Sequence, residues 1–482
     1  HAFEPGLRVM GVLLPRRRRS IHHQSRVVHH APVARAHGGG QQPGIGLQRT
    51  AEDEIAVVDD PVRRNGLHRD GQHHVGLAQG PLGGGRRRLA FVVTHPIQYY
   101  VPIYRLLAAR DEVEVKGFFT WHAGQASRFD PGFQREVAWD IPLTEGYDFE
   151  AVPNTAVDSG PHRFGGIRCP ELAARVRAWR PDAVHLTGYA YHAHLRLLWA
   201  LHRHGVPVLF RGDSHLLDAA PAAKRLLKSI VLRAIFSWPE VFLFTGQNNR
   251  RYYEAFGVPA AKLVACPHSI EISRFADNAE QHEREAAEWR AALGLPAATP
   301  VLLFAGKFET KKRPVELVRA FRQLGRTAWQ LVMLGDGPLR QAVEAEAAQA
   351  PDLIRVLPFQ NQSRMPVTYR LGDVFVLPSA FDETWGLAVN EALACGRPVL
   401  VSDKVGCAPD VVSAGVNGEV FRADDWGDFR RALERLLSRV TPGKRMAQFP
   451  DSLRGAGIAD TVAGVMRGLE VSQQMVSAGG NH

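Results

Sequence analysis

One stretch in the last quarter of the chain, Phe375 to Asp403, constrains the fold more than any other. It opens with a short apolar run, which is followed by a polar loop. From Gly386 onward the apolar residues recur at a helical spacing, and Gly396 stands where such a helix should end. A second apolar run, Val399 to Val401, is typical of a buried strand. The order strand, helix, strand predicts a βαβ unit with parallel strands and a right-handed crossover.

The start of this predicted helix has the chemistry of an anion-binding site. The backbone N–H groups of Gly386 and Leu387 would point out of the helix N-terminus, where phosphate binds readily. Two acids flank the turn, Glu383 in the loop and Glu391 inside the helix. An ionised carboxylate only accepts hydrogen bonds, so it suits the hydroxyl groups of a sugar. The stretch therefore predicts a nucleotide-sugar ligand, although Glu391 alone is also a favourable partner for the helix dipole.

The segment FDETWGLAVNEALACGRPVLVSD closely resembles the E-x7-E signature of the family 4 (GT4) retaining glycosyltransferases. Glu383 and Glu391 stand at its two acids, Gly386 and Leu387 at its phosphate turn, and Thr384 replaces a common glycine. The resemblance implies an α/β protein of the GT-B fold, with two Rossmann-like domains that face a central cleft. It also implies that Glu383 positions sugar hydroxyls and that Glu391 binds the nucleotide ribose.

Composition narrows the alternatives. The chain has 482 residues, of which 45% are hydrophobic, so two or three globular domains are expected. No segment approaches the run of about 18 apolar residues that a membrane-spanning helix needs. The four cysteines are scattered without a CxxC pair, which argues against a disulfide framework or a zinc site and predicts free thiols in a reducing cytoplasm.

Residues 1–85 do not resemble a folded domain. They contain Arg16 to Arg19 and several glycine runs, and they lack apolar periodicity. Residues 1–88 hold 14 arginines against 7 acids, so +7 of the net charge of +10 lies there. One interpretation is a disordered basic extension that touches anionic lipid or nucleic acid. The favoured interpretation is a gene-model artefact or a tail without function, since the chain begins with His rather than Met.

The remaining chain is predicted to form two domains and their connections. The expected parts are an N-terminal acceptor-binding Rossmann-like domain (86–275), an interdomain connection (276–298), a C-terminal donor-binding domain (299–440), and a C-terminal helix that returns to the first domain, with a tail (441–482).

Two loops of the first domain carry candidate residues. The segment THPIQY follows the first strand and resembles the substrate loop of many family 4 members, so His95 and Gln98 are expected to face the cleft. The loop RGDSHLL follows a later strand and supplies three candidates, Arg211, Asp213 and His215. Together with the first acid of the signature, His95 and Asp213 are the predicted catalytic residues, while Gln98 and His215 are predicted acceptor contacts. The alternatives are a purely structural loop for His95 and a surface ion pair between Arg211 and Asp213.

The second domain is expected to bind the donor. Its first strand ends at Gly306, and the loop that follows contains Lys307 and Lys312. These lysines resemble the basic residues that hold the donor diphosphate in family 4, and they would stabilise negative charge on the leaving nucleoside diphosphate. Lys311 is a competing candidate. The loop PFQNQSRMP usually meets the base in this family, so Gln360 is a donor candidate as well.

A basic amphipathic helix is predicted at Arg225 to Phe236. Such a helix can lie on an anionic membrane surface, where many family 4 members find lipid-linked acceptors. An ordinary solvated helix face is the favoured alternative.

The resemblance as a whole implies a retaining glycosyltransferase of the hexosyltransferase type, cytoplasmic or peripheral on the inner face of the plasma membrane. It would move a sugar from a nucleotide-diphosphate sugar to a glycan or lipid-linked acceptor in cell-surface polysaccharide or glycolipid biosynthesis. The family needs no metal or other cofactor, and departing phosphate deprotonates the incoming hydroxyl. The alternatives are another GT-B enzyme, such as a sugar-nucleotide epimerase or a phosphorylase, and a non-enzymatic basic nucleic-acid-binding protein. The sequence leaves the donor sugar, its base, the acceptor and the oligomeric state open.

Overall fold

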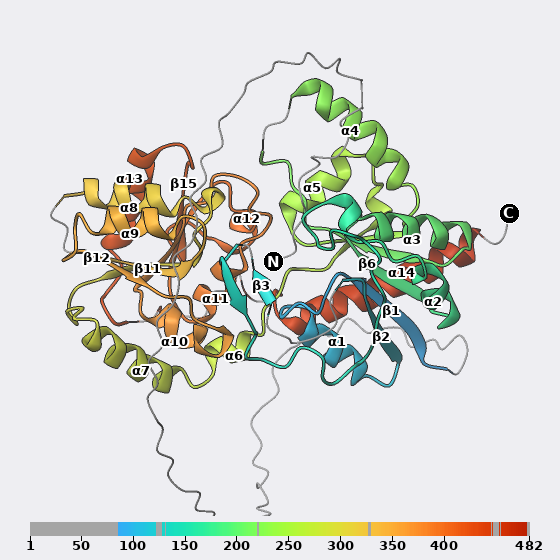
Figure 1. Cartoon of the computed structure of the whole chain (residues 1–482), viewed down its shortest axis with the longest axis horizontal. Coiled ribbons are helices and arrows are strands. Elements are labelled where there is room, and N and C mark those ends of the chain that lie inside the picture. Colours follow the sequence, from blue (N-terminus) through green and yellow to red (C-terminus); the bar gives the residue numbers. More distant parts are fainter. Residues whose placement is uncertain are drawn as a thin grey trace, which may run out of the picture. The chain divides into compact units, whose positions relative to one another are not determined.

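The computed structural model describes residues 85–479 except 122–127, 131, 219–220, 326–328, 445, 447–452 and 454. The expected N-terminal extension therefore lies almost wholly outside the described residues. Within them, two parallel β-sheets form the centres of two α/β domains (Figure 1).

The sheet of the first domain has seven parallel strands among the described residues, in the order β5-β2-β1-β6-β7-β8-β9. The strands are β1 (Arg87–Val93), β2 (Val113–Phe119), β5 (Asp148–Ala151), β6 (Ala183–Thr187), β7 (Val208–Arg211), β8 (Val241–Phe244) and β9 (Leu263–Ala265). Side chains of β1 alternate between two cores, as a strand buried on both faces requires: Ala90 and Val92 join one, and Leu89, Phe91 and Val93 join the other.

Helices cover both faces of this sheet. They are α1 (Val101–Ala108), α2 (Leu172–Ala178), α3 (His192–Arg203), α4 (Ala222–Ile235), α5 (Gln247–Ala255) and the last helix of the chain, α14 (Ile458–Gly479). Helices α2 to α5 pack into the core that contains Val92, whereas α1 and α14 pack into the core that contains Phe91. A short antiparallel hairpin, β3 (Arg128–Asp130) with β4 (Arg135–Val137), also belongs to this part of the chain.

The sheet of the second domain has six parallel strands in the described chain, in the order β12-β11-β10-β13-β14-β15. The strands are β10 (Val301–Lys307), β11 (Gln330–Asp336), β12 (Ile354–Leu357), β13 (Val374–Leu377), β14 (Val399–Ser402) and β15 (Gly418–Phe421). Its helices are α8 (Pro314–Gln323), α9 (Arg340–Ala347), α10 (Met365–Arg370), α11 (Leu387–Ala394), α12 (Ala408–Val411) and α13 (Trp426–Leu437). The predicted βαβ unit is confirmed, because β13 and β14 pair in parallel on either side of α11.

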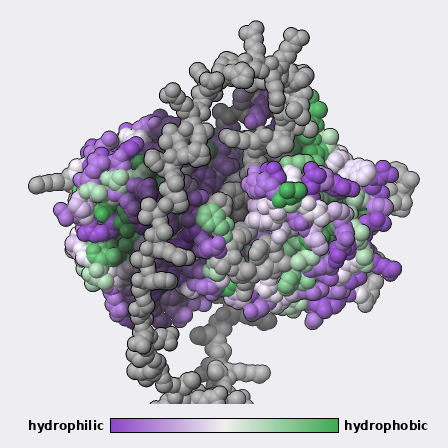
Figure 2. All heavy atoms as spheres, viewed as in Figure 1, coloured by the Kyte–Doolittle hydropathy of each residue, from purple (hydrophilic) through white to green (hydrophobic). Residues whose placement is uncertain are grey.

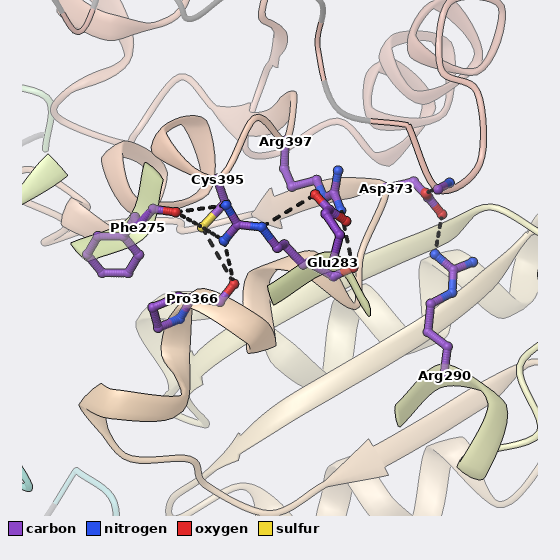
Figure 3. A network of polar contacts seen from close by, with 9 residues as sticks. Phe275, Glu283, Arg290, Pro366, Asp373, Cys395 and Arg397 are labelled. Atoms are coloured by element: carbon purple, nitrogen blue, oxygen red, sulfur yellow. Dashed lines mark hydrogen bonds and ion pairs between the residues drawn. The ribbon is translucent and has the colours of Figure 1, made fainter. Parts of the chain in front are cut away.

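Two helices precede the second sheet, α6 (Ile272–Ala276) and α7 (Ala279–Ala292), and α7 occupies most of the expected connection. Charged side chains fasten α7 to the second domain (Figure 3). Glu283 accepts from Arg397 at 2.5 Å and lies 3.4 Å from Arg370, while Arg290 donates to Asp373 at 3.1 Å. Arg370 and Arg397 are both buried, so the Glu283 carboxylate of α7 contacts two arginines in the interior of the second domain. This helix is therefore a packed part of that domain and not an open tether.

The chain ends in the first domain. Val462, Val465 and Leu469 of α14 are buried in the same core as Phe91 of β1. The helix lies very close to the sheet at Gly464, where an added Cβ would come within 2.5 Å of the Ala265 carbonyl oxygen.

Candidate functional site

The candidate site begins at the N-terminus of α11. Gly386 precedes the helix with φ +93°, in the left-handed region that favours glycine. An added Cβ would also lie 2.9 Å from the Val405 side chain. Glycine is thus required here both by conformation and by packing. The first N–H groups of α11, beginning at Leu387, lack acceptors within the helix itself, so this end of α11 can receive an anion.

Glu383 and Lys312 form a buried ion pair next to this helix end. The Lys312 ammonium group donates to Glu383 Oε2 at 2.5 Å, and the Ser379 hydroxyl donates to the same oxygen at 3.0 Å. Burial alone would raise the pKa of Glu383, but the charges of Lys312 and Lys311 and the two hydrogen bonds hold it below its ordinary value. Glu383 therefore stays ionised near neutral pH and can accept hydrogen bonds from a ligand. The structure brings the predicted first acid and one predicted phosphate-binding lysine into direct contact.

Lys307, the other predicted phosphate-binding lysine, is buried at the end of β10. Its ammonium group donates to Asp130 of the β3–β4 hairpin, at 2.8 Å to Oδ1 and 3.1 Å to Oδ2. The same carboxylate accepts from the backbone N–H groups of Gly132 and Phe133. Burial by itself would raise the pKa of Asp130, but Lys307 and these two N–H groups hold it below its ordinary value.

Glu391 lies one turn inside α11 and is buried between two tyrosines. The Tyr99 hydroxyl donates to Oε1 at 3.0 Å, and the Tyr369 hydroxyl donates to Oε2 at 2.6 Å. Arg274 lies 3.8 Å from Oε1. Burial raises the pKa of Glu391 above its ordinary value, although Arg274 and both phenol hydrogen bonds oppose the rise. Tyr99 comes from the THPIQYY segment of the first domain, so this contact joins the two domains.

Asp213 forms a further contact between the domains. Its carboxylate accepts from the Thr384 hydroxyl at 2.8 Å, and His268 Nε2 lies 3.9 Å away. Burial would raise the pKa of Asp213, but its contacts with His268 and Thr384 hold it below its ordinary value. Burial lowers the pKa of His268, although its contact with Asp213 opposes the shift. His268 also packs against Trp385, with ring centroids 5.6 Å apart.

Four further predicted residues, His95, Gln98, His215 and Gln360, lie outside the ion pairs described above. His95 Nδ1 lies 2.8 Å from the hydroxyl of its neighbour Thr94, and the ring meets Trp121 edge-on. His215 Nδ1 accepts from the Leu217 backbone N–H at 3.2 Å. Gln98 and Gln360 are half-buried, and the Gln360 side chain donates to the Pro358 carbonyl at 3.4 Å.

The structure also shows what surrounds Arg211 and Gly306. The Arg211 guanidinium donates to the Cys266 and Pro267 carbonyls at the end of the first domain, so the surface ion pair with Asp213 does not form. Gly306 lies beside Lys312, since an added Cβ would meet that side chain at 3.8 Å.

Sequence reasoning missed several residues at the site, among them Tyr99, Asp130, Arg274 and Tyr369. Only Tyr99 had a usable signal, because it directly follows Gln98 in the loop already singled out. Asp130, Arg274 and Tyr369 meet their partners through folding alone.

In the part of the chain that the structure describes, no three His, Cys, Asp or Glu side chains are grouped so that they could hold a metal ion. Among the same residues, no helix is both long enough and apolar enough to cross a membrane.

Both domains match known protein families. Residues 285–449 match the family described as Glycosyl transferases group 1, and residues 103–268 match the Glycosyl transferase 4-like domain. A D-inositol 3-phosphate glycosyltransferase from Nocardiopsis dassonvillei is 29% identical over 207 residues, which are 40% of this chain and 46% of the relative. The chain thus spans about half the length of that curated relative.

Solved structures share the whole two-domain arrangement. Sucrose-phosphate synthase from Thermosynechococcus elongatus is similar with a TM-score of 0.58 and 21% identity, over 82% of this chain and 100% of that one. Anabaena Alr3699/HepE, solved in complex with UDP and glucose, is similar with a TM-score of 0.56 and 14% identity, over 79% of this chain and 99% of that one. At such identities these likenesses show the fold.

Proposed function

Because the chain belongs to the family 4-like glycosyltransferases of the GT-B fold, as its E-x7-E segment predicted, we propose that it transfers a sugar, with retention, from a nucleotide-diphosphate sugar to a hydroxyl of a glycan or lipid-linked acceptor. The observation that carries this proposal is the buried Lys312–Glu383 pair beside the N-terminus of α11. The pair supplies a cation and an ionised acid beside a helix N-terminus, which supports binding of a nucleotide-sugar donor by all three groups. The family match favours transfer over epimerase, phosphorylase or non-enzymatic alternatives.

Two lysines of this chain supply the positive charge that a donor diphosphate needs. Lys312 and Lys307, with the N–H groups at Gly386 and Leu387, would bind the phosphate oxygens. They would also stabilise the negative charge that grows on the nucleoside diphosphate as its bond to the sugar breaks. We therefore expect transfer to proceed without a metal ion or other cofactor.

The acids would hold the two ends of the donor. Glu383 accepts from sugar hydroxyls, and Glu391 accepts from the ribose. In the transfer step the bond from the sugar C1 to the phosphate oxygen breaks, and a bond from C1 to the acceptor oxygen forms on the same face. The acceptor proton passes to an oxygen of the departing phosphate. Asp213 and His95 of the first domain are the residues we expect nearest the acceptor oxygen.

Helix α4 supplies a surface for a lipid-linked acceptor. Leu226, Leu227 and Ile230 are 66%, 52% and 62% exposed, and their spacing places them in one stripe. Lys224 and Arg233 flank the stripe on either side, and the opposite face of α4 packs on the first domain. Figure 2 shows hydrophobic surface in the region where Figure 1 places α4. We propose that α4 rests on an anionic membrane on the cytoplasmic side, with its basic residues facing the lipid phosphates.

A donor screen tests the transferase proposal. UDP-, GDP-, ADP- and dTDP-sugars are added to the full chain, and thermal unfolding is followed. UDP-glucose comes first, because the similar Alr3699/HepE structure contains UDP and glucose. A ligand that binds only the folded state stabilises it by about 2.7 kcal/mol at a hundred times its Kd. We expect one donor to raise Tm.

Three lysine and glutamate variants make the screen specific. Lys312→Ala and Glu391→Ala should abolish the shift. Lys262→Ala should retain it, since Lys262 donates to the Pro239 carbonyl elsewhere in the first domain. The absence of any shift from the folded wild-type protein, or an equal shift in all three variants, would count against the proposed donor site.

A further inference from the structure

Asp130 stands out because it binds a donor-site lysine from the other domain. Lys307 is buried and is paired with this carboxylate at 2.8 Å. The Lys307 ammonium group also lies 4.8 Å from the centre of the Phe133 ring. A buried lysine is costly unless its charge is compensated, so Asp130 stabilises the site while it holds no donor.

The β3–β4 hairpin and the residues after it make further contacts with the second domain. Phe133 packs edge-on against Phe359, with ring centroids 4.6 Å apart, and the Arg135 guanidinium lies 5.1 Å from the same ring. The Asn361 side chain donates to the Ala138 carbonyl at 2.6 Å. These contacts lie on the loop after β12, which is the loop expected to meet the nucleotide base.

Asp140 adds a separate anchor for the same segment. Its carboxylate accepts from the Ser363 backbone N–H at 3.1 Å and from the Ser363 hydroxyl. Arg135 lies 3.8 Å from Asp336 at the end of β11. Together with Lys307 at the end of β10, the hairpin segment thus contacts the chain at the carboxyl ends of β10 and β11 and in the loop after β12. Parallel sheets bind ligands at these carboxyl ends.

The hairpin and a diphosphate would compete for Lys307. An added Cβ on Gly132 would meet Glu309 Oε1 at 2.4 Å and the Lys307 Nζ and Cδ atoms at 2.6 Å, so Gly132 lies directly against the lysine. A phosphate beside the Asp130 carboxylate would also place like charges together in a buried site, which is strongly unfavourable.

We propose that Asp130 is a further residue of the donor site, an internal substitute for the donor diphosphate. It holds Lys307 while the site is empty, and the diphosphate takes its place when the donor binds. Donor binding and release of the β3–β4 hairpin from the second domain are therefore coupled, and Asp130 lowers the affinity for nucleoside diphosphates. This inference rests on the proposed function, because it requires Lys307 to bind the diphosphate.

The test is calorimetric titration of the full chain with UDP, GDP and ADP. Asp130→Asn removes the competing charge and keeps the shape of the side chain. We expect it to bind its nucleotide about tenfold more tightly than wild type, the effect of about one charge-assisted hydrogen bond. The Tm without ligand should fall, because Lys307 loses its ion pair with Asp130, and the rise in Tm at saturating nucleotide should be larger than for wild type.

Two other variants serve as control and as independent test. Glu136→Gln makes the same change of charge at an exposed position of β4 and should leave the affinity within about twofold of wild type. Asp140→Asn keeps Asp130 but weakens the separate anchor on Ser363. It should tighten binding too, by a smaller factor, and it keeps the proposal testable if Asp130→Asn folds poorly.

The outcomes separate the two proposals. If wild type binds a nucleotide but neither Asp130→Asn nor Asp140→Asn tightens it, the coupling is refuted and the transferase proposal stands. Weaker binding by Asp130→Asn would mean that Asp130 only orients Lys307. If neither wild type nor any variant binds a nucleotide, both proposals fall.

Discussion

The two acids of the signature are eight residues apart and both buried, yet their surroundings shift their pKa values in opposite directions. Glu383 accepts from the Lys312 ammonium group, and its pKa lies below the ordinary value. Glu391 accepts from two neutral phenols, Arg274 is a more distant counter-charge, and burial raises the pKa of Glu391. One acid is thus held ionised, and the other costs folding energy when ionised.

This difference predicts opposite dependences of stability on pH. Glu383, with a depressed folded pKa, contributes stability above its unfolded pKa, and that stability is lost as pH falls through the folded value. Glu391, with a raised folded pKa, contributes stability below its unfolded pKa, and that stability is lost as pH rises through the folded value. Urea unfolding of Glu383→Gln and Glu391→Gln, compared with wild type at each pH, measures both contributions.

Near neutral pH, Glu383→Gln should cost about 3 kcal/mol, because it leaves a lysine buried without its charged partner. That cost should shrink as pH falls through the folded pKa of Glu383. Glu391→Gln should instead become more stable relative to wild type as pH rises. The same direction of pH dependence for both substitutions would contradict the assignment.

Helix α4 has an exposed apolar stripe as well as a packed face. Its packed face buries Leu232 and Ile235, whereas Leu226, Leu227 and Ile230 face outward. The hydrophobic spacing in the sequence could predict the helix, but it could not tell which apolar residues the domain would leave uncovered.

The α4 surface predicts membrane binding that depends on both apolar area and lipid charge. We expect the double substitution Leu226→Ser and Ile230→Ser to weaken binding to phosphatidylglycerol-containing vesicles at least about tenfold, because two aliphatic side chains no longer enter the lipid. Co-sedimentation with vesicles measures it. As a control, Leu106→Ser with Val416→Ser removes two exposed apolar side chains elsewhere and should change little. Equal loss in both double variants, or no binding by wild type, would refute the role of α4.

Helix α14 completes the core of the first domain although it follows the second domain in the sequence. Val462, Val465 and Leu469 fill a core otherwise built by residues 89–266. The first sheet therefore gains its full core only after the second domain has been synthesised.

Close packing of α14 gives a sharp prediction. Gly464→Ala would place a methyl group 2.5 Å from the Ala265 carbonyl oxygen and 2.8 Å from the Cys266 Cα, and backbone atoms cannot easily move away. We expect it to destabilise the protein by about 1–3 kcal/mol, as overpacking does. Thermal and urea unfolding measure the change.

The matched control is Gly427→Ala in α13. There the added methyl would meet only the ends of the Asp425 and Arg431 side chains, at 3.1 and 3.5 Å. Since alanine favours helix, this substitution should be neutral or should stabilise by up to about 1 kcal/mol. If both alanine substitutions change the free energy of unfolding equally, α14 does not pack closely on the first sheet at Gly464.

The local sequence was enough to predict those features that depend on residues close together in the chain. The helical spacing after Gly386, the glycine required at φ +93° and the apolar runs on either side fixed the β13–α11–β14 unit, because neighbouring residues alone decide them. The same stretch identified the family, and the fold followed from the family.

The tertiary structure alone decided which partner each site residue meets. Asp130 on Lys307, Tyr99 on Glu391 and Thr384 on Asp213 each join residues 171 or more positions apart. Such pairs depend on how two separately built sheets come together, and no periodicity along the chain carries that information. The sequence therefore supplied the candidate groups for a donor site, while the fold decided which of them contact the other domain.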